Sequence, residues 1–327
     1  MAACELVDPC RTVALKRSCT RGGNHSKILG VPVPATATVA DSPPRLRVVR
    51  TPGATVWTDD AVSVQLGVDP DDVSVGQLVE RLLAPGVEVA HTFKDDRKSL
   101  VRRIVVQSRP WVVKHYRGPS WKTRWCHRVR RTPAWREWIA AGVLARGGVR
   151  VLKPWALVHI GPTRCCQQAL IMPFVDGLSL HHWLKQRPGS PDPQHRLLHR
   201  VVAAAIGRQI GQITAMGYVN RDHKASNLMI DAVCERGGDP CLIDPARLKR
   251  RVAVTASDDS VALMVARLWR SSRRVGALTV AERLIVMREL LRTDPSAGCG
   301  IRELAGRIDA MDRKLHHQLE SNRSKRS

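Results

Sequence analysis

The chain has 327 residues, of which 43% are hydrophobic. That length and composition allow a large buried core and exclude a chain that is disordered throughout. No uncharged apolar run reaches the roughly 18 residues that a membrane-spanning helix requires. Residues 1–19 also lack the apolar stretch of a secretory signal peptide.

Charge is the distinctive bulk property. Lys and Arg number 53 against 29 Asp and Glu, which gives a formal net charge of +24 and an isoelectric point near 10.8. Such a charge favours polyanionic partners: anionic glycans, lipid headgroups or nucleic acid. The nine Cys and twelve His are scattered without the spacing of zinc ligands. We therefore expect reduced thiols and a cytoplasmic location rather than a disulfide framework or a zinc site.

The N-terminal part begins with an irregular segment. Residues 1–54 are rich in Pro, Thr, Arg and Gly with weak periodicity, which predicts a flexible basic extension. Residues 69–84 carry an apolar stripe that predicts a short helix. Residues 100–106 and 111–116 are rich in strand-forming residues, and a turn at 107–110 separates them. We expect these two runs to form strands of a sheet.

A basic loop and a helix follow these strands. Residues 118–131 interleave basic residues with two tryptophans, which fits a docking surface for an anionic glycolipid or an ordinary solvated loop equally well. Thr132 and Pro133 predict a helix start, because a hydroxyl N-cap followed by proline favours the first turn. Two glycines after Arg146 predict its end.

The rest of the chain is increasingly helical. The elements expected after residue 147 are strands up to 175, a short helix at 179–186, the longest helix of the chain at 196–216, short strands at 227–231 and 240–243 joined by a glycine turn, and helices over 258–317.

This order of elements predicts an α+β, bilobal protein. The expected domains are a flexible basic extension at 1–54, an N-terminal β-sheet lobe with one helix and a preceding short helix at 55–175, a mostly helical C-terminal lobe at 176–317, and a basic tail at 318–327.

Candidate catalytic residues follow the long helix. Asp222 and Asn227 have the D-x4-N spacing of a kinase catalytic loop. In that arrangement Asp222 would accept the proton of an acceptor hydroxyl, and Asn227 would bind Mg²⁺. Lys224 would neutralise charge on the transferred phosphoryl group. A chance match in a polar loop is the alternative, but the preceding Arg221 and the apolar strand that follows favour the catalytic interpretation.

Three further residues complete a phosphoryl-transfer site. Asp244 ends an apolar strand and would bind Mg²⁺, although a strand-end Asp considered alone is more often a cap. Lys114 lies inside an apolar strand, where a charge is unfavourable unless it is paired. Glu137 lies on the apolar face of the next helix and is the expected partner. Lys114, Glu137, Asn227 and Asp244 are thus the expected ATP- and Mg²⁺-binding residues.

Several short motifs carry a resemblance to known proteins. They are Val-Val-Lys-His-Tyr-Arg at 112–117, Arg-Glu-Trp at 136–138, Gly-Gly-Val at 147–149, Met-Pro-Phe-Val-Asp-Gly at 172–177, Asn-Arg-Asp at 220–222 with Asn227, and Leu-Ile-Asp at 242–244. With them the chain resembles the protein-kinase-like superfamily and, within it, the bacterial lipopolysaccharide kinases of the Kdo/WaaP family. The resemblance covers about residues 90–250.

The resemblance has specific implications. It implies a kinase-like fold, the use of ATP and Mg²⁺, and phosphorylation of sugar hydroxyls at the inner face of the cytoplasmic membrane. It implies functional roles for Lys114, Glu137, Asp222, Asn227 and Asp244.

The sequence also departs from the kinase pattern. No Gly-x-Gly-x-x-Gly loop precedes Lys114, and residues 98–103 occupy the expected hairpin, so we expect a turn without glycines to cover the phosphates. Asn220 stands where the kinase pattern has His. A Pro-Ala pair follows Asp244 where protein kinases have Phe-Gly, so an ordinary activation-loop switch is not expected.

These observations favour an ATP-dependent kinase that phosphorylates a sugar hydroxyl of a lipopolysaccharide-type or other anionic glycan. The basic residues 249–251 suit an acidic acceptor, and an anionic membrane surface is a further expected contact. An atypical Ser/Thr protein kinase and a non-catalytic basic scaffold that binds nucleic acid are the alternatives. A pure scaffold has no need of the five polar positions, which argues against it.

Overall fold

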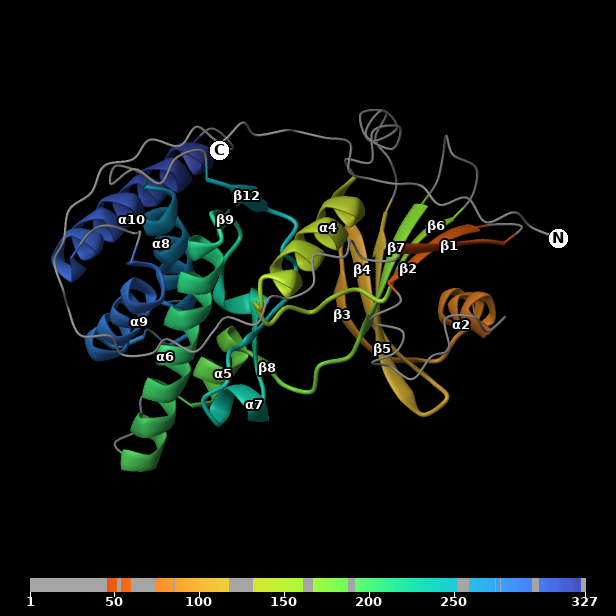
Figure 1. Cartoon of the computed structure of the whole chain (residues 1–327), viewed down its shortest axis with the longest axis horizontal. Coiled ribbons are helices and arrows are strands. Elements are labelled where there is room, and N and C mark those ends of the chain that lie inside the picture. Colours follow the sequence, from red (N-terminus) through yellow and green to blue (C-terminus); the bar gives the residue numbers. More distant parts are fainter. Residues whose placement is uncertain are drawn as a thin grey trace, which may run out of the picture. The chain divides into compact units, whose positions relative to one another are not determined.

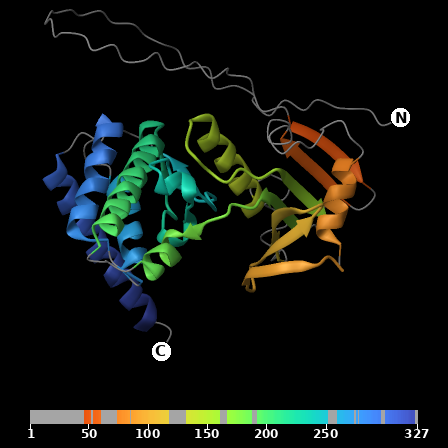
Figure 2. The ribbon, with the colours of Figure 1, turned by 90° about the horizontal axis from the view of Figure 1, so that it is seen from below.

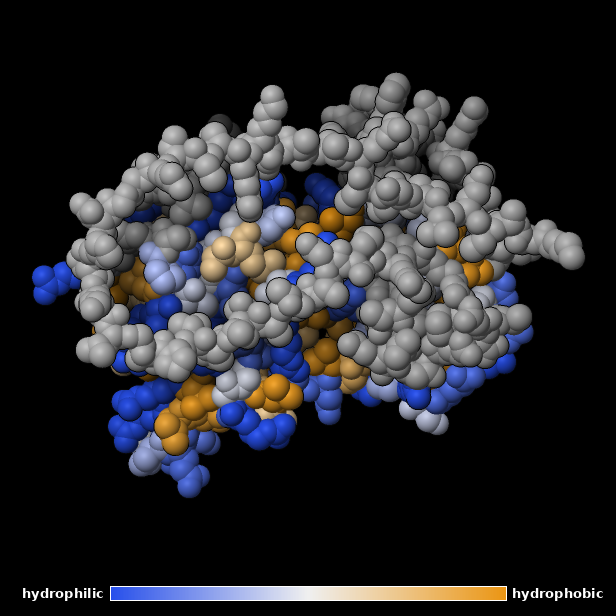
Figure 3. All heavy atoms as spheres, in the orientation of Figure 1, coloured by the Kyte–Doolittle hydropathy of each residue, from blue (hydrophilic) through white to orange (hydrophobic). Residues whose placement is uncertain are grey.

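The computed structural model describes most of the chain from Leu46 onward (Figure 1). The described residues are 46–51, 54–59, 74–84, 86–117, 132–160, 167–187, 192–251, 259–273, 275–276, 278–295 and 300–324. Nearly all of the predicted N-terminal extension and the basic loop at 118–131 lie outside these ranges. On the face drawn in Figure 3, hydrophilic side chains cover much of the described helical region. No helix among the described residues is long and apolar enough to span a membrane.

In the described part of the chain, seven strands form one antiparallel sheet of order β1-β2-β6-β7-β5-β4-β3. The strands are β1 Leu46–Thr51, β2 Ala54–Asp59, β3 Val89–Asp95, β4 Ser99–Val106, β5 Arg109–Tyr116, β6 Ala156–Ile160 and β7 Gln167–Pro173. The strands predicted at 100–106 and 111–116 are confirmed. Strand β1 lies within the segment predicted to be a flexible extension, so that boundary was placed too late.

A two-residue turn joins β4 to β5. Val106 pairs with Arg109, and Gln107 and Ser108 between them have φ values of 52° and 60°. Paired left-handed residues match the twist of a tight hairpin. The turn therefore fixes the register of β5 and, with it, the face of the sheet on which each β5 side chain lies.

Two helices cover opposite faces of the sheet, as Figures 1 and 2 show: α2 (Ser74–Leu83) and α4 (Pro133–Arg146). Trp111 and Val113 of β5 belong to the apolar cluster that contains α2, whereas Val112 packs with Trp135 of α4. Because successive side chains of a strand point to opposite faces, Lys114 lies on the α4 face.

Helix α4 begins and ends where the sequence predicts. The Thr132 hydroxyl accepts a hydrogen bond of 3.2 Å from the Trp135 amide, which caps the first turn. At the other end, Gly148 has φ 78°, and the Val149 amide bonds to the Leu144 carbonyl at 3.0 Å. This left-handed glycine is the ordinary way in which a chain leaves a helix at a sharp angle.

The C-terminal part is mostly helical, as expected (Figure 1). Its elements are β8 Leu178–Ser179, α5 Leu180–Gln186, α6 Pro193–Ala215, β9 Tyr218–Asn220, η1 Ala225–Asn227, β10 Leu228–Ile230, α7 Ala232–Glu235, β11 Cys241–Leu242, β12 Leu248–Arg250, α8 Ser260–Ser272, α9 Val280–Thr293 and α10 Ile301–Ser324.

Three expectations for this part were wrong in detail. The longest described helix is α10, with 24 residues, rather than α6, with 23. Helix α10 continues through residues 318–324, which were predicted to be part of a basic tail. The short helix α7 occupies the connection between β10 and β11, and the Asp231 side chain caps it by accepting a 3.1 Å bond from the Cys234 amide.

Helices α6 and α9 approach each other closely at a glycine. A Cβ atom on Gly207 would lie 2.5 Å from the Val286 carbonyl oxygen and 2.9 Å from the Glu289 Cβ. The absence of a side chain at this position therefore sets the distance between the two helices, and with it the position of the segment that follows α6.

Gly207→Ala is expected to lower the free energy of unfolding by about 1–3 kcal/mol, because the new methyl group overlaps backbone atoms that cannot move freely. Gly142→Ala in α4 is the matched control: its nearest neighbour is the flexible end of Arg146, at 3.6 Å. This control is expected to gain about 0.5–1 kcal/mol from helix propensity. Urea unfolding measures both, and equal midpoints for the two variants would contradict the close approach.

Candidate active site

Lys114 and Glu137 form a buried ion pair. The Lys114 Nζ atom lies 2.7 Å from Glu137 Oε2, and the two side chains are 12% and 3% exposed. Strand register places Lys114 on the face that α4 covers, and Glu137 lies on the buried side of α4. A buried charge requires a partner, since neither side chain can be solvated there. The predicted pairing is confirmed.

Tyr116 is a third member of this cluster, which the sequence interpretation missed. Its hydroxyl donates a hydrogen bond to Glu137 Oε2. Burial, together with the Glu137 charge, raises the pKa of Tyr116 well above its ordinary value, so the hydroxyl keeps its proton and remains a donor. Its position two residues after Lys114 was the available signal, because residues i and i+2 of a strand share a face.

Asp244 also contacts Lys114. The Nζ–Oδ1 distance is 3.1 Å, so the ammonium group lies between two carboxylates. Burial alone would lower the pKa of Lys114, but the charges of Glu137 and Asp244 outweigh it and raise the pKa. For Asp244, burial alone would raise the pKa, but the charge of Lys114 holds it below its ordinary value. Both groups are therefore charged at neutral pH.

The segment that leaves α4 positions the strand that carries Asp244. The Leu242 amide bonds to the Arg150 carbonyl at 3.0 Å, and the Leu152 amide bonds to the Leu242 carbonyl at 2.8 Å. The Arg150 guanidinium is also paired with Asp231. The chain leaving α4 thus pairs with β11 at Leu242. Asp244 lies two residues after this contact.

Asp244 has an unusual backbone conformation. Its φ is 53°, in the left-handed region that residues other than glycine seldom adopt. Such a conformation persists only where the surrounding contacts hold it. The ion pair with Lys114 is one such contact, and it fixes the direction of the carboxylate.

Asp222, Lys224 and Asn227 form a second connected group. Lys224 Nζ lies 3.0 Å from Asp222 Oδ2. The Asn227 amide nitrogen donates to the Asp222 carbonyl at 3.0 Å and reaches Asp222 Oδ2 at 3.3 Å. Because the amide nitrogen is directed at Asp222, the amide oxygen of Asn227 is left as a candidate metal ligand.

The two groups share one site. The Ile243 amide donates to the Asn227 carbonyl at 2.9 Å, which places Asn227 beside the strand that ends at Asp244. Lys224 also contributes to the lowered pKa of Asp244. The structure therefore places all six sequence-predicted residues in two groups. Within each group the side chains contact one another, and the two groups lie next to each other. Their catalytic and binding roles remain predictions.

Asn227 and Asp244 supply one amide oxygen and one carboxylate, which suits Mg²⁺ bound together with phosphate oxygens. Among the described residues there is no cluster of three or more His, Cys, Asp or Glu side chains able to hold a metal.

The hairpin between β3 and β4 occupies the place of a glycine-rich loop. The Asp96 carboxylate accepts hydrogen bonds from the amides of Lys98, at 2.9 Å, and Ser99, at 2.8 Å. Lys94 and these amides hold the pKa of Asp96 well below its usual range. The Asp96 carboxylate already accepts hydrogen bonds from amides that a phosphate could otherwise use. The hydrogen-bond donors that this turn offers to a phosphate are therefore the exposed side chains of Arg97 and Lys98.

Asn220 and His223 depart most from the usual catalytic loop. Asn220 is fully buried, and its side-chain oxygen accepts a 3.0 Å bond from the Asp222 amide. It therefore helps to position Asp222 without a histidine. His223 is also fully buried, and neither of its ring nitrogens has a hydrogen-bond partner within the described part of the chain.

Comparison with known proteins finds matches among solved structures. The structure of WaaP in complex with acyl carrier protein matches with a TM-score of 0.52 and 21% identity, over 80% of this chain and 98% of that one. The kinase domain of PknI from Mycobacterium tuberculosis matches with a TM-score of 0.38 and 14% identity, over 71% and 96%. No protein-family model and no curated protein sequence matches the chain.

The similarity to WaaP identifies the class of fold. The chain has a protein-kinase-like bilobal fold, with an antiparallel sheet in the N-terminal part and helices in the C-terminal part. The predicted α+β fold is confirmed. The similarity to the WaaP structure agrees with the resemblance to the Kdo/WaaP kinases that the sequence motifs predicted.

The substitution Lys114→Met is expected to lower the free energy of unfolding by about 3–5 kcal/mol, because the buried Glu137 carboxyl loses its cationic partner. The double variant Lys114→Met/Glu137→Gln removes both charges and is expected to recover most of that loss. Chemical denaturation of the two variants measures the difference. A double variant no more stable than the single one would show that the ion pair is not the source of the loss.

The buried His223 is expected to make the fold sensitive to acid. Burial lowers the pKa of His223 to about 4, whereas the unfolded chain binds a proton near the ordinary pKa of about 6.5. Stability is therefore lost as the pH falls from above 6.5 to about 4, by roughly 3 kcal/mol for this residue. His223→Leu is expected to raise stability and to flatten this dependence.

The control for this measurement is His317→Gln, at a site where the side chain is 80% exposed. It is expected to leave the slope of stability against pH unchanged. If His223→Leu and His317→Gln have the same slope between pH 4 and 6.5, the acid sensitivity has another origin.

Proposed function

We propose that this chain is an ATP-dependent phosphotransferase, and that its acceptor is a sugar hydroxyl of a lipopolysaccharide-type or other anionic glycan. The observation that carries the phosphotransferase part is the contact of Lys114 with both Glu137, at 2.7 Å, and Asp244, at 3.1 Å. This contact joins a cation suited to phosphates with a carboxylate suited to Mg²⁺. The adjoining Asp222 supplies a base, so the three requirements of phosphoryl transfer meet in one place.

The residues divide the reaction as follows. Lys114 binds the α- and β-phosphates. The acceptor oxygen forms a bond to the γ-phosphorus, the bond from that phosphorus to the β-phosphate oxygen breaks, and ADP leaves. Asp222 takes the hydroxyl proton, and Lys224 stabilises charge on the transferred group. Bound Mg²⁺, held by Asn227 and Asp244, would neutralise charge on the phosphate oxygens.

Exposed basic residues and the short segment that follows Asp244 support a small anionic acceptor. Lys249 and Arg250 of β12 are exposed beyond Asp244, whereas Arg251 is buried and pairs with Asp294 at 3.5 Å. Of the basic run predicted to face the acceptor, Arg251 therefore does not contribute. Only residues 245–259 separate Asp244 from α8, which leaves little chain for the long activation segment that protein kinases use to hold a peptide.

We also propose that the protein works in the cytoplasm, at the inner face of the cytoplasmic membrane. Its net charge of +24 supports this location, because anionic headgroups attract basic surfaces there.

Asp222→Asn is expected to lower phosphate transfer by about 10²–10⁴-fold, because the general base is lost while the shape of the side chain is kept. Binding of ATP with Mg²⁺ should remain close to that of the wild type. The assay is transfer of labelled phosphate from ATP to a panel of lipopolysaccharide core, free sugars and generic protein. Asp309→Asn, at an exposed position on α10, is the control and should retain full transfer.

Three outcomes would decide against parts of this proposal. Undiminished transfer by Asp222→Asn, or a wild-type protein that does not bind ATP with Mg²⁺, would reject the phosphotransferase assignment. Transfer to protein but to no sugar or glycan would replace the proposed acceptor with a protein substrate.

A further inference from the structure

Three arginines from separate segments meet beside Asp222. Arg221 follows β9, Arg247 precedes β12, and Arg267 lies on α8. The Arg221 amide donates to the Arg247 carbonyl at 3.1 Å, and the Arg267 guanidinium donates to the Arg221 carbonyl. One backbone contact and one contact made by the Arg267 side chain therefore hold the three positions together.

The charges in this cluster are not balanced. The pKa of Arg267 is lowered by partial burial and by the like charges of Arg247 and Arg221, and Asp222 is the one carboxylate that opposes this effect. Asp222 itself is already paired with Lys224 at 3.0 Å. Arg221 and Arg247 are thus near enough to repel Arg267, and an anion bound among the three would offset that repulsion.

Some arginines in the helical part have carboxylate partners: Arg208 pairs with Asp239 at 3.3 Å, and Arg273 pairs with Asp312 at 2.7 Å. Within the described part of the chain no carboxylate forms an ion pair with any of the three arginines near Asp222. Arg221 and Arg247 are exposed, so an anion from solution can reach both side chains.

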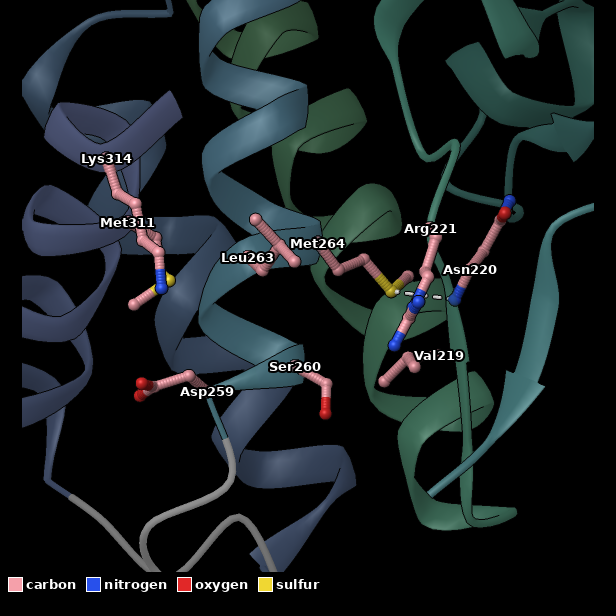
Figure 4. Close-up of a pocket in the computed structure, with 9 residues that line it drawn as sticks. All are labelled: Val219, Asn220, Arg221, Asp259, Ser260, Leu263, Met264, Met311 and Lys314. Atoms are coloured by element: carbon pink, nitrogen blue, oxygen red, sulfur yellow. Dashed lines mark hydrogen bonds between the residues drawn. The ribbon is translucent and has the colours of Figure 1, made fainter. Parts of the chain in front are cut away.

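Space for a ligand adjoins the cluster. A pocket of about 240 Å³ lies between β9, α8 and α10, and Arg221 is among the residues that line it. Figure 4 shows the Arg221 side chain pointing toward this pocket, away from the side chain of Asn220. Lys314 and Asp259 also line the pocket, and Asp259 is paired with Arg307 at 3.1 Å, whereas Arg247 and Arg267 do not line it. The guanidinium of Arg221 is therefore accessible to a small anion.

We infer that Arg221, Arg247 and Arg267 form a subsite for a phosphate monoester that the acceptor already carries, close to the hydroxyl that Asp222 deprotonates. The inference rests on the proposed function, because it assigns the substrate class of the same site. Guanidinium groups bind phosphate through paired hydrogen bonds. Three of them suit a phosphate dianion better than a singly charged carboxylate. The subsite would position the acceptor, while Lys114 binds the nucleotide.

The test uses the full chain with its nucleotide site filled by a non-hydrolysable ATP analogue and Mg²⁺. Calorimetric titrations compare glucose 6-phosphate, inorganic phosphate, glucuronate and glucose. We expect the two phosphates to bind the wild type, and glucuronate and glucose to bind more weakly or not at all. Arg247→Gln and Arg267→Gln should each weaken phosphate binding about tenfold or more.

The matched control is Arg200→Gln, which removes the same charge at an exposed position of α6. It should leave phosphate binding unchanged. Arg247 is exposed, so its variant is expected to fold even if Arg267→Gln, which loses a bond to the Arg221 carbonyl, does not.

The inference is overturned by any of three results. These are equal weakening in Arg200→Gln and Arg247→Gln, glucuronate binding as tight as that of glucose 6-phosphate, or loss of phosphate binding once the ATP analogue is bound. Titration of the analogue itself separates this inference from the proposed function. A protein that binds phosphate but not the analogue rejects the phosphotransferase assignment alone, and one that binds the analogue but not phosphate rejects the subsite alone.

Discussion

The contact of one ammonium group with two carboxylates is the constraint on which the rest of the site depends. Lys114 can reach Glu137 only if the β4–β5 turn sets the strand register and if α4 presents its buried face to the sheet. It can reach Asp244 only if the chain leaving α4 pairs with β11. Elements distant in sequence therefore converge on a single buried cation, and an error in any of them would leave a charge without a partner.

The segment around Asp222 shows how side-chain amides can hold a carboxylate-bearing residue in place. The Asn220 side-chain oxygen accepts a hydrogen bond from the Asp222 backbone amide, and the Asn227 side chain donates one to the Asp222 carbonyl. Two side-chain amides therefore position the candidate base. The His223 side chain, by comparison, is fully buried and makes no hydrogen bond to any described residue. We have no physical account of why a histidine is present there, because an apolar side chain would meet the same packing need without a desolvation cost.

The sequence was informative where local chemistry determines structure. The ends of α4, the β4–β5 turn and the pairing of Lys114 with Glu137 follow from caps, turn residues and periodicity. The remainder depends on distant partners. Strand β1 lies in a Pro-rich region that predicts no strand, yet it pairs with β2, which in turn pairs with β6 about a hundred residues later. The arginine cluster likewise comes from three segments, which no local pattern relates.

The turn capped by Asp96 has a consequence for the nucleotide binding proposed above, in how the affinity would respond to ionic strength. A loop that binds phosphates with backbone amides uses fixed dipoles close to the ligand. This turn instead offers the exposed side chains of Arg97 and Lys98. Their attraction acts through solvent and is screened within about 8 Å at physiological salt, whereas the buried Lys114 is screened far less. Added salt should therefore weaken the attraction of Arg97 and Lys98 for the phosphates at a lower concentration than it weakens the attraction of Lys114.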